Sequence, residues 1–278
     1  MKDAGGVIDY AERQSNPPTL ISFKKYYHIK RTAMNYQEST WNGFRRLDFE
    51  LEGYNAILVL PNEPNAARRL AMKMEYFDAF PATEIAMLKA GYHLAHIKNR
   101  SRFATDDDSD RKSRLIDFLA DEFGTARKIV TVGMSAGGFQ SIAFAARYPE
   151  KVSFLYLDAP LISFFSVGNK LFDSMVMGKR WPEIRDAYGF KTFAEAYCYP
   201  DQPVNRLPIL VKHRLPVGLV YGVLDDAAPP AFNAEIIREL YEAEGAPIKT
   251  WARQLYGHHP HGLEDPTPLL DYIEEVAL

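Results

Sequence analysis

The stretch KIVTVGMSAGGFQSIAFAARYP, residues 128–149, decides the fold. Its β-branched apolar start predicts a buried strand at Lys128–Val132, and the small residues that follow predict a helix. Between them, GMSAG at residues 133–137 places one serine between glycines, the pattern of a sharp strand-to-helix turn that exposes a hydroxyl. The pattern predicts Ser135 as a nucleophile and the N–H of Ala136 as a donor to negative charge on a reacting oxygen.

Strands and helices alternate over most of the chain, which predicts an α/β fold with a mostly parallel sheet covered by helices on both faces. Strands are expected at Arg46–Leu51 and Asn55–Leu60 (joined by Glu52-Gly53), at Tyr92–Ile97, and within residues 151–160, 215–226 and 247–255. Helices are expected at Pro81–Ala90, from Asp110 as the cap to Gly124, and within residues 231–245 and 266–278. Residues 68–80 also favour a helix, and TDDDSD at 105–110 is expected to be a solvated loop that leads into the helix cap.

The segment from about 161 to 204 breaks this alternation. It is rich in phenylalanine, tyrosine and tryptophan and shows no clear strand. We expect it to be a helical lid inserted over the carboxyl edge of the sheet, within one domain that spans residues 1–278.

Composition narrows the possible partners. The chain has 278 residues, of which 47% are apolar and 25% charged, and its net charge of −3 favours neither nucleic acid nor an anionic membrane as a partner. The basic, aromatic segment at residues 23–31 is better explained as an N-terminal surface segment than as an RNA site. One cysteine, no apparent signal peptide and no apolar run of membrane-spanning length predict a cytoplasmic location.

A serine nucleophile needs an acid and a histidine from later loops. Asp225 follows the strand expected at Val217–Tyr221 and can reach the same sheet edge as Ser135, so it is the preferred acid. Its neighbour Asp226 stays open as an alternative, and Asp158, at the end of an earlier strand, is a weaker candidate.

The loop GHHPH at residues 257–261 follows the last expected strand and holds three of the seven histidines. His258 leaves the strand first and is the preferred base, with His261 as its rival. A metal site in this loop is disfavoured because no acidic partner set has matching spacing. The order serine, acid, histidine is that of α/β-hydrolase triads.

From about Asp48 onward the chain resembles the α/β-hydrolase superfamily. GMSAGG, YGVLDDAAP and GHHPHGLEDPTPLLDYI stand at the family's nucleophile, acid and histidine positions. The last motif also resembles a bacterial subgroup related to prolyl-oligopeptidase-like and carbohydrate-esterase-like hydrolases. The chain departs from that subgroup at residues 68–77 and at Ala136, where the subgroup often has tryptophan and arginine.

The resemblance implies a serine esterase that acts through an acyl-enzyme on a small-molecule ester, including acetyl or short-acyl esters of carbohydrates, with no cofactor and no metal. Two alternatives stay open: a prolyl-oligopeptidase-like peptidase, and a catalytically inactive hydrolase scaffold that binds a partner. The second backbone donor to the oxyanion is expected within residues 61–73. Acyl and alcohol specificity and homo-oligomer formation are left open.

Overall fold

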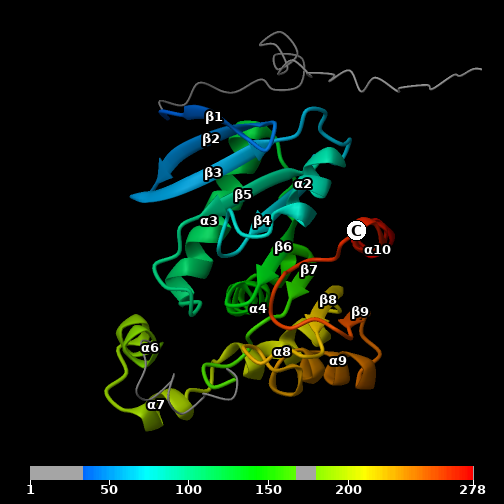
Figure 1. Ribbon diagram of the computed structural model, residues 1–278. Helices are drawn as coiled ribbons and strands as arrows, with labels where there is room; N and C mark the ends of the chain where they lie inside the picture. Colours follow the sequence, from blue (N-terminus) through cyan, green and yellow to red (C-terminus); the bar gives the residue numbers. More distant parts are fainter. Residues whose placement is uncertain (1–33, 167–179, 278) are drawn as a thin grey trace, which may run out of the picture.

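The computed structural model describes residues 34–166 and 180–277, so the basic, aromatic segment at 23–31 lies outside the described residues. The described strands form one sheet of nine, in the order β1-β2-β3-β5-β4-β6-β7-β8-β9 (Figure 1). They span Gln37–Trp41 (β1), Phe44–Leu51 (β2), Tyr54–Leu60 (β3), Leu70–Lys73 (β4), His93–Ile97 (β5), Ile129–Met134 (β6), Val152–Asp158 (β7), Val217–Gly222 (β8) and Ile248–Arg253 (β9). β1, β2, β3 and β5 pair antiparallel in turn, whereas the pairs formed by β4 to β9 are parallel.

Helices cover both faces of the sheet, which confirms the predicted α/β architecture. On β7, Leu155 and Leu157 belong to the core cluster that holds side chains of α3, α4, α8 and α9, while Phe154 and Tyr156 belong to the cluster with α2 and α10. This alternation is the period-2 geometry of a strand buried on both sides. The helices span Ala82–Lys89 (α2), Asp106–Phe123 (α3), Gly137–Arg147 (α4), Pro203–Lys212 (α8), Ala234–Ala243 (α9) and Thr267–Val276 (α10).

Two hairpins begin the described part of the sheet. The expected hairpin at Glu52-Gly53 is confirmed, and both of its residues have positive φ, 54° and 79°. The strand β1 was not expected, although Asn42-Gly43 connects it to β2 with φ of 49° and 83°. Asn-Gly is a strong hairpin signal because both residues tolerate the left-handed backbone of a two-residue turn.

The prediction of a helix-prone segment at residues 68–80 is wrong. Residues Leu70–Lys73 form β4, which pairs with β5 and β6 and is fully buried. Leucine and methionine favour helices in isolation, but tertiary burial overrides this weak preference. The position of β4 has a consequence for the active site, because its carboxyl end lies next to the strand that leads to Ser135.

The helix α3 begins earlier than expected. Its cap is Thr105, whose hydroxyl oxygen accepts a hydrogen bond from the N–H of Asp108, so the predicted cap Asp110 lies inside the helix. The aspartates at 106–108 form the first turn, where negative charge is favourable against the helix dipole. The expected end at Gly124 is confirmed by its left-handed φ of 69°.

The expected insertion is helical where it is described. It contains α6 (Arg180–Tyr188) and α7 (Phe193–Tyr197), which lie together at the lower left in Figure 1, and residues 167–179 of it lie outside the described residues. Its Ile184 and Tyr188 share a core cluster with Phe139 of α4, and the Tyr188 hydroxyl donates to the backbone oxygen of Phe103 at 2.8 Å. The insertion therefore packs beside the helix that follows Ser135.

None of the helices in the two described ranges combines the length and the apolar character needed to cross a bilayer.

We expect acid to destabilise the fold in part through His96. Burial lowers the pKa of His96 to about 4, and the neutral ring donates from Nδ1 to the Lys73 backbone oxygen at 2.8 Å. The unfolded chain takes up this proton near pH 6.5 and the folded chain does not, so stability is lost as pH falls from about 6.5 to about 4. At pH 5 the loss attributable to His96 is about 2 kcal/mol.

Urea unfolding of the wild type and of His96→Gln at pH 7 and pH 5 measures this loss. The variant should lose about 2 kcal/mol less between the two pH values, because the buried His93 contributes equally to both proteins. Equal losses in the two proteins would contradict the assignment to His96.

Candidate active site

Ser135 occupies a sharp turn between β6 and α4. Its φ of 51° is left-handed, which is uncommon for a residue other than glycine. The turn is held on both sides, because the Ser135 N–H donates to the Asp158 backbone oxygen at 2.9 Å and the Leu161 N–H donates to the Ser135 oxygen at 2.9 Å. The turn thus places the hydroxyl at the carboxyl ends of the parallel strands.

Close packing explains two glycines of the GMSAGG motif. A Cβ at Gly138 would lie 2.6 Å from the Cβ of Pro160, and one at Gly133 would lie 2.8 Å from the backbone oxygen of Gly137. A Cβ at Gly137 would meet nothing closer than 3.6 Å, the Cβ of Glu75. The helix can therefore approach the sheet closely only with glycine at 133 and 138.

The structure brings Ser135, His258 and Asp225 into one chain of hydrogen bonds. His258 Nε2 lies 3.0 Å from Ser135 Oγ, and His258 Nδ1 lies 2.7 Å from Asp225 Oδ2. Asp225 follows β8 and His258 follows β9, so three loops at one sheet edge supply the three groups. The arrangement allows the histidine to accept the serine proton while the carboxylate orients the ring.

Asp225 is held as a carboxylate. Burial raises its pKa, but hydrogen bonds from His258 and from the N–H groups of Ala228 and Ala227 outweigh burial, so its pKa lies below the usual 3.8. Its alternative, Asp226, is exposed and makes none of these contacts. The geometry thus joins Asp225, and not Asp226, to the histidine.

The rival base and the weaker acid candidate pair with each other. His261 Nδ1 lies 3.0 Å from Asp158 Oδ1, and the other carboxylate oxygen accepts from the Tyr156 hydroxyl at 2.8 Å and from the Gly262 N–H. The His261 side chain is only 2% exposed. This second pair lies next to the first, since the ring centroids of His258 and His261 are 4.8 Å apart.

The topology places most of the window 61–73, expected to hold the second oxyanion donor, away from Ser135. β4 rather than β3 pairs with β6, so residues 61–69 lie at the amino ends of the parallel strands, opposite Ser135. The loop that reaches the serine turn starts after β4. In it, the nitrogen of Glu75 lies 3.7 Å from the position of a Cβ on Gly137. Among the described residues, no acceptor binds the N–H groups of Ala136 or Glu75.

A partly buried polar network supports this loop, and it was missed in the sequence. The Asn99 amide donates to the Met74 backbone oxygen and to Glu75 Oε2, both at 2.7 Å. Lys112 in turn donates to Asn99 Oδ1 and to Gln140 Oε1, the latter at 2.8 Å. Burial lowers the Lys112 pKa to about 8. Lys112 and Gln140 lie on the core-facing sides of their helices. Polar residues at such positions were the signal of this network that the sequence offered.

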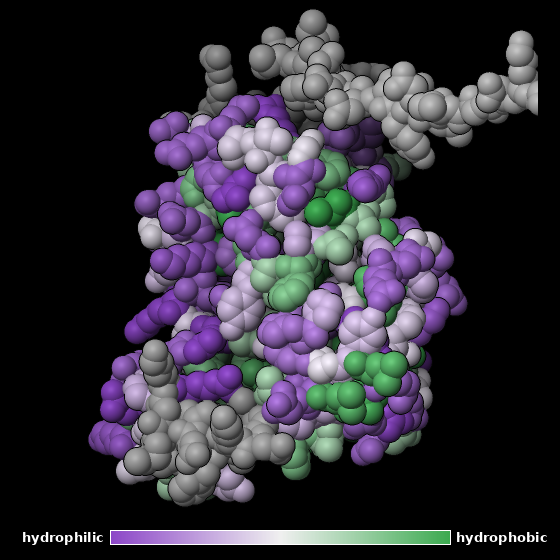
Figure 2. Space-filling model, in the orientation of Figure 1, coloured by the Kyte–Doolittle hydropathy of each residue, from purple (hydrophilic) through white to green (hydrophobic). Residues whose placement is uncertain are grey.

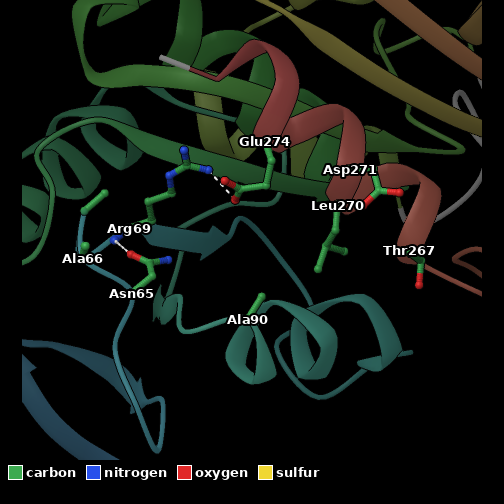
Figure 3. A pocket seen from close by; sticks show the side chains of 9 residues that line it. Asn65, Ala66, Arg69, Ala90, Thr267, Leu270, Asp271 and Glu274 are labelled. Carbon is green, nitrogen blue, oxygen red and sulfur yellow. Dashed lines mark hydrogen bonds and ion pairs between the residues drawn. The ribbon is translucent and has the colours of Figure 1, made fainter.

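A separate hollow of about 480 Å³ lies at the opposite edge of the sheet from Ser135. Figure 3 shows it between α10 and the loop before β4, where Arg69 is paired with Glu274 and its N–H donates to Asn65 Oδ1 at 3.0 Å. Because this loop lies at the amino ends of the parallel strands, the hollow is not part of the site around Ser135.

Comparison with known proteins identifies the fold. No protein-family model and no curated protein matches the sequence. Among solved structures, an α/β-hydrolase enzyme, MGS-MChE2, from the metagenome of sediments of the Mar Chica lagoon in Morocco, is similar with a TM-score of 0.54 and 14% identity, over 86% of this chain and 98% of that one. The chain has the α/β-hydrolase fold.

Two other structures show the same α/β-hydrolase fold in different contexts. A candidate lipase from Acinetobacter baumannii AYE has a TM-score of 0.57 and 12% identity, over 86% of this chain and 92% of the other. Dipeptidyl peptidase 4 from Porphyromonas gingivalis has a TM-score of 0.60 and 14% identity over 95% of this chain, which spans only 38% of the peptidase. The likeness thus covers only part of a much longer protein.

We expect Gly138→Ala to destabilise the protein by about 2 kcal/mol or more, because the added methyl would overlap Pro160 and the Leu161 backbone oxygen. Gly137→Ala is the matched control, since its methyl makes only ordinary contacts and its φ is not left-handed. Urea unfolding at pH 7 compares the two variants with the wild type. Similar unfolding midpoints for the two variants would contradict the packing explanation.

Proposed function

We propose that the protein is a serine hydrolase that cleaves carboxylic esters of small molecules. The observation that carries the proposal is the continuous chain from Asp225 through His258 to Ser135, with contacts of 2.7 and 3.0 Å at the left-handed turn. A serine hydroxyl is a weak nucleophile, and a histidine oriented by a buried carboxylate is the arrangement that activates it.

In the proposed reaction, Ser135 Oγ attacks the ester carbonyl carbon and His258 Nε2 takes the hydroxyl proton. The carbonyl oxygen becomes an oxyanion, which the N–H groups of Ala136 and Glu75 would stabilise, each by roughly 3 kcal/mol of barrier. His258 then returns the proton to the leaving alcohol, and an acyl-enzyme forms. Water then attacks the acyl carbon while His258 takes its proton, and His258 passes that proton to Ser135 Oγ as the carboxylic acid leaves.

The loops that carry Asp225 and His258 also expose apolar side chains, which supports a substrate with an acyl group. Val223, Leu224 and Leu255, in the loops after β8 and β9, are 39%, 62% and 87% exposed. Figure 2 shows hydrophobic residues gathered at the lower right of the molecule, where Figure 1 draws β8, β9 and α9. Acetyl and short-acyl esters, including those of carbohydrates, are the substrates we propose to test first.

Peptide cleavage is the second candidate. It is favoured by the similarity to dipeptidyl peptidase 4, although the chain spans only 38% of that protein. A panel of aminoacyl p-nitroanilides set against p-nitrophenyl acetate and butyrate distinguishes the two candidates. Faster turnover of the anilides would replace the esterase proposal with the peptidase one.

The direct test is Ser135→Ala. We expect it to lower kcat for p-nitrophenyl acetate by at least about 10³-fold and to abolish labelling by a fluorophosphonate probe, because the attacking oxygen is removed. The far-ultraviolet circular dichroism spectrum controls for folding. A folded variant that matches the wild type in both hydrolysis and labelling would show that Ser135 is not the nucleophile.

The neighbouring aspartates offer a matched pair of variants. Asp225→Asn should lower kcat by about 10⁴-fold, because an amide cannot hold the histidine tautomer that accepts the serine proton. Asp226→Asn should stay within about threefold of the wild type, because its side chain is exposed and lies outside the triad. Esterase kinetics at pH 8 measure both, and equal losses in the two variants would remove Asp225 from its proposed role.

A further inference from the structure

Three imidazole rings of the loop after β9 lie against one another. The centroids of His258, His259 and His261 are 4.8 to 5.0 Å apart, and their planes cross at 68° to 83°. One nitrogen from each ring lies within 4.8 Å of the other two. The arrangement is therefore a compact set of nitrogen ligands and not a row of separate surface histidines.

Buried carboxylates hold two of the rings from behind. His258 Nδ1 contacts Asp225 at 2.7 Å, and His261 Nδ1 contacts Asp158 at 3.0 Å. Metal-binding histidines usually have one ring nitrogen bonded to a carboxylate in this way, which fixes the tautomer and leaves the other nitrogen for the ion. The spacing of acidic residues in the sequence did not indicate carboxylates near these histidines. The fold nevertheless brings Asp225 and Asp158 into contact with two of them.

The third ring gives access from solvent. His259 is exposed, and its ring stacks on Phe80 with a centroid distance of 5.2 Å and an interplanar angle of 13°. His261 is buried, and the exposure of His258 is intermediate, with 13% of its side chain exposed. An ion can therefore reach the cluster from the His259 side.

We propose that His258, His259 and His261 bind a divalent transition-metal ion of the Zn²⁺ type. Imidazole nitrogen suits Zn²⁺, which takes tetrahedral ligands at about 2.0–2.1 Å, and three protein ligands leave the fourth position to water. Nitrogens in such a site lie about 3.3 Å apart. The rings must therefore close by about 1.5 Å at most from their present spacing.

Metal binding at this site is inhibitory, a consequence that rests on the proposed function. The nitrogen of His258 that does not contact Asp225 is Nε2, the same atom that lies 3.0 Å from Ser135 Oγ. An ion bound to Nε2 occupies the lone pair that would accept the serine proton. The metal-bound and the active forms are thus mutually exclusive, because the ion blocks the base.

Binding is tested first, without reference to activity. The full chain, freed of metal with a chelator, is titrated with CoCl₂ by visible absorption and with ZnCl₂ by calorimetry. We expect one ion per chain, and Ser135→Ala should bind at least as tightly because the competing hydroxyl is gone. Asp158→Asn should weaken binding about 10- to 100-fold through the orientation of His261.

His259→Ala is the decisive variant and His213→Ala its control. Loss of one of three ligands should weaken Zn²⁺ binding at least about tenfold, as even loss of a supporting residue does. His213 is exposed at the end of α8, so its replacement should leave binding unchanged. No binding by the wild type, or equal affinities for His259→Ala and His213→Ala, would overturn the site.

Inhibition is tested separately with p-nitrophenyl acetate. Zn²⁺ should inhibit the wild type reversibly, with recovery after EDTA, and the half-inhibiting concentration should rise in His259→Ala at least about tenfold, relative to that variant's own metal-free rate. Specific binding with no effect on hydrolysis would overturn the inhibitory role. If the wild type hydrolyses no ester, the proposed function fails, and the Co²⁺ and Zn²⁺ titrations still decide for or against the site.

Discussion

The left-handed backbone of Ser135 is the constraint on which the rest of the site depends. A side chain at φ 51° costs of order 1 kcal/mol or more and persists only where its surroundings hold it. Here β6, β7 and α4 hold it together, through backbone bonds to Asp158 and Leu161 and through the close approach that Gly133 and Gly138 permit. The strain is local, whereas the structure that maintains it is the whole central sheet.

The order of the parallel strands then determines which loops meet at this turn. β6 pairs with β4 on one side and with β7 on the other, and β7, β8 and β9 continue in parallel, so the loop after β4 and the loops after β8 and β9 reach the same edge. Asn99 and Lys112 connect the loop after β4 to α3 and α4. The buried ammonium of Lys112 has its polar contacts inside this network, which satisfies a charge that would otherwise be costly to bury.

Local patterns in the sequence predicted much of the fold. Alternating apolar runs, the helix end at Gly124 and the glycine-flanked serine all report on their own surroundings, and the elements they predict are present. Features that depend on distant residues could not be read in this way. Leu70–Lys73 is a strand because β5 and β6 enclose it, and the choice of residues 61–73 for the oxyanion donor followed from missing that strand. The pairing of His261 with Asp158 is likewise a product of tertiary structure, since 103 positions separate them.

Asp158 joins the two halves of the site. Its backbone oxygen accepts the Ser135 N–H, while its carboxylate accepts the Tyr156 hydroxyl and the Gly262 N–H and contacts His261, three residues after His258. The serine turn and the histidine loop are thus both bonded to one residue, at the end of one strand. Because both segments are bonded to the same strand, they move with it when the sheet deforms. The distance between the Ser135 hydroxyl and the His258 ring should therefore vary less than the distance between two loops without a shared anchor.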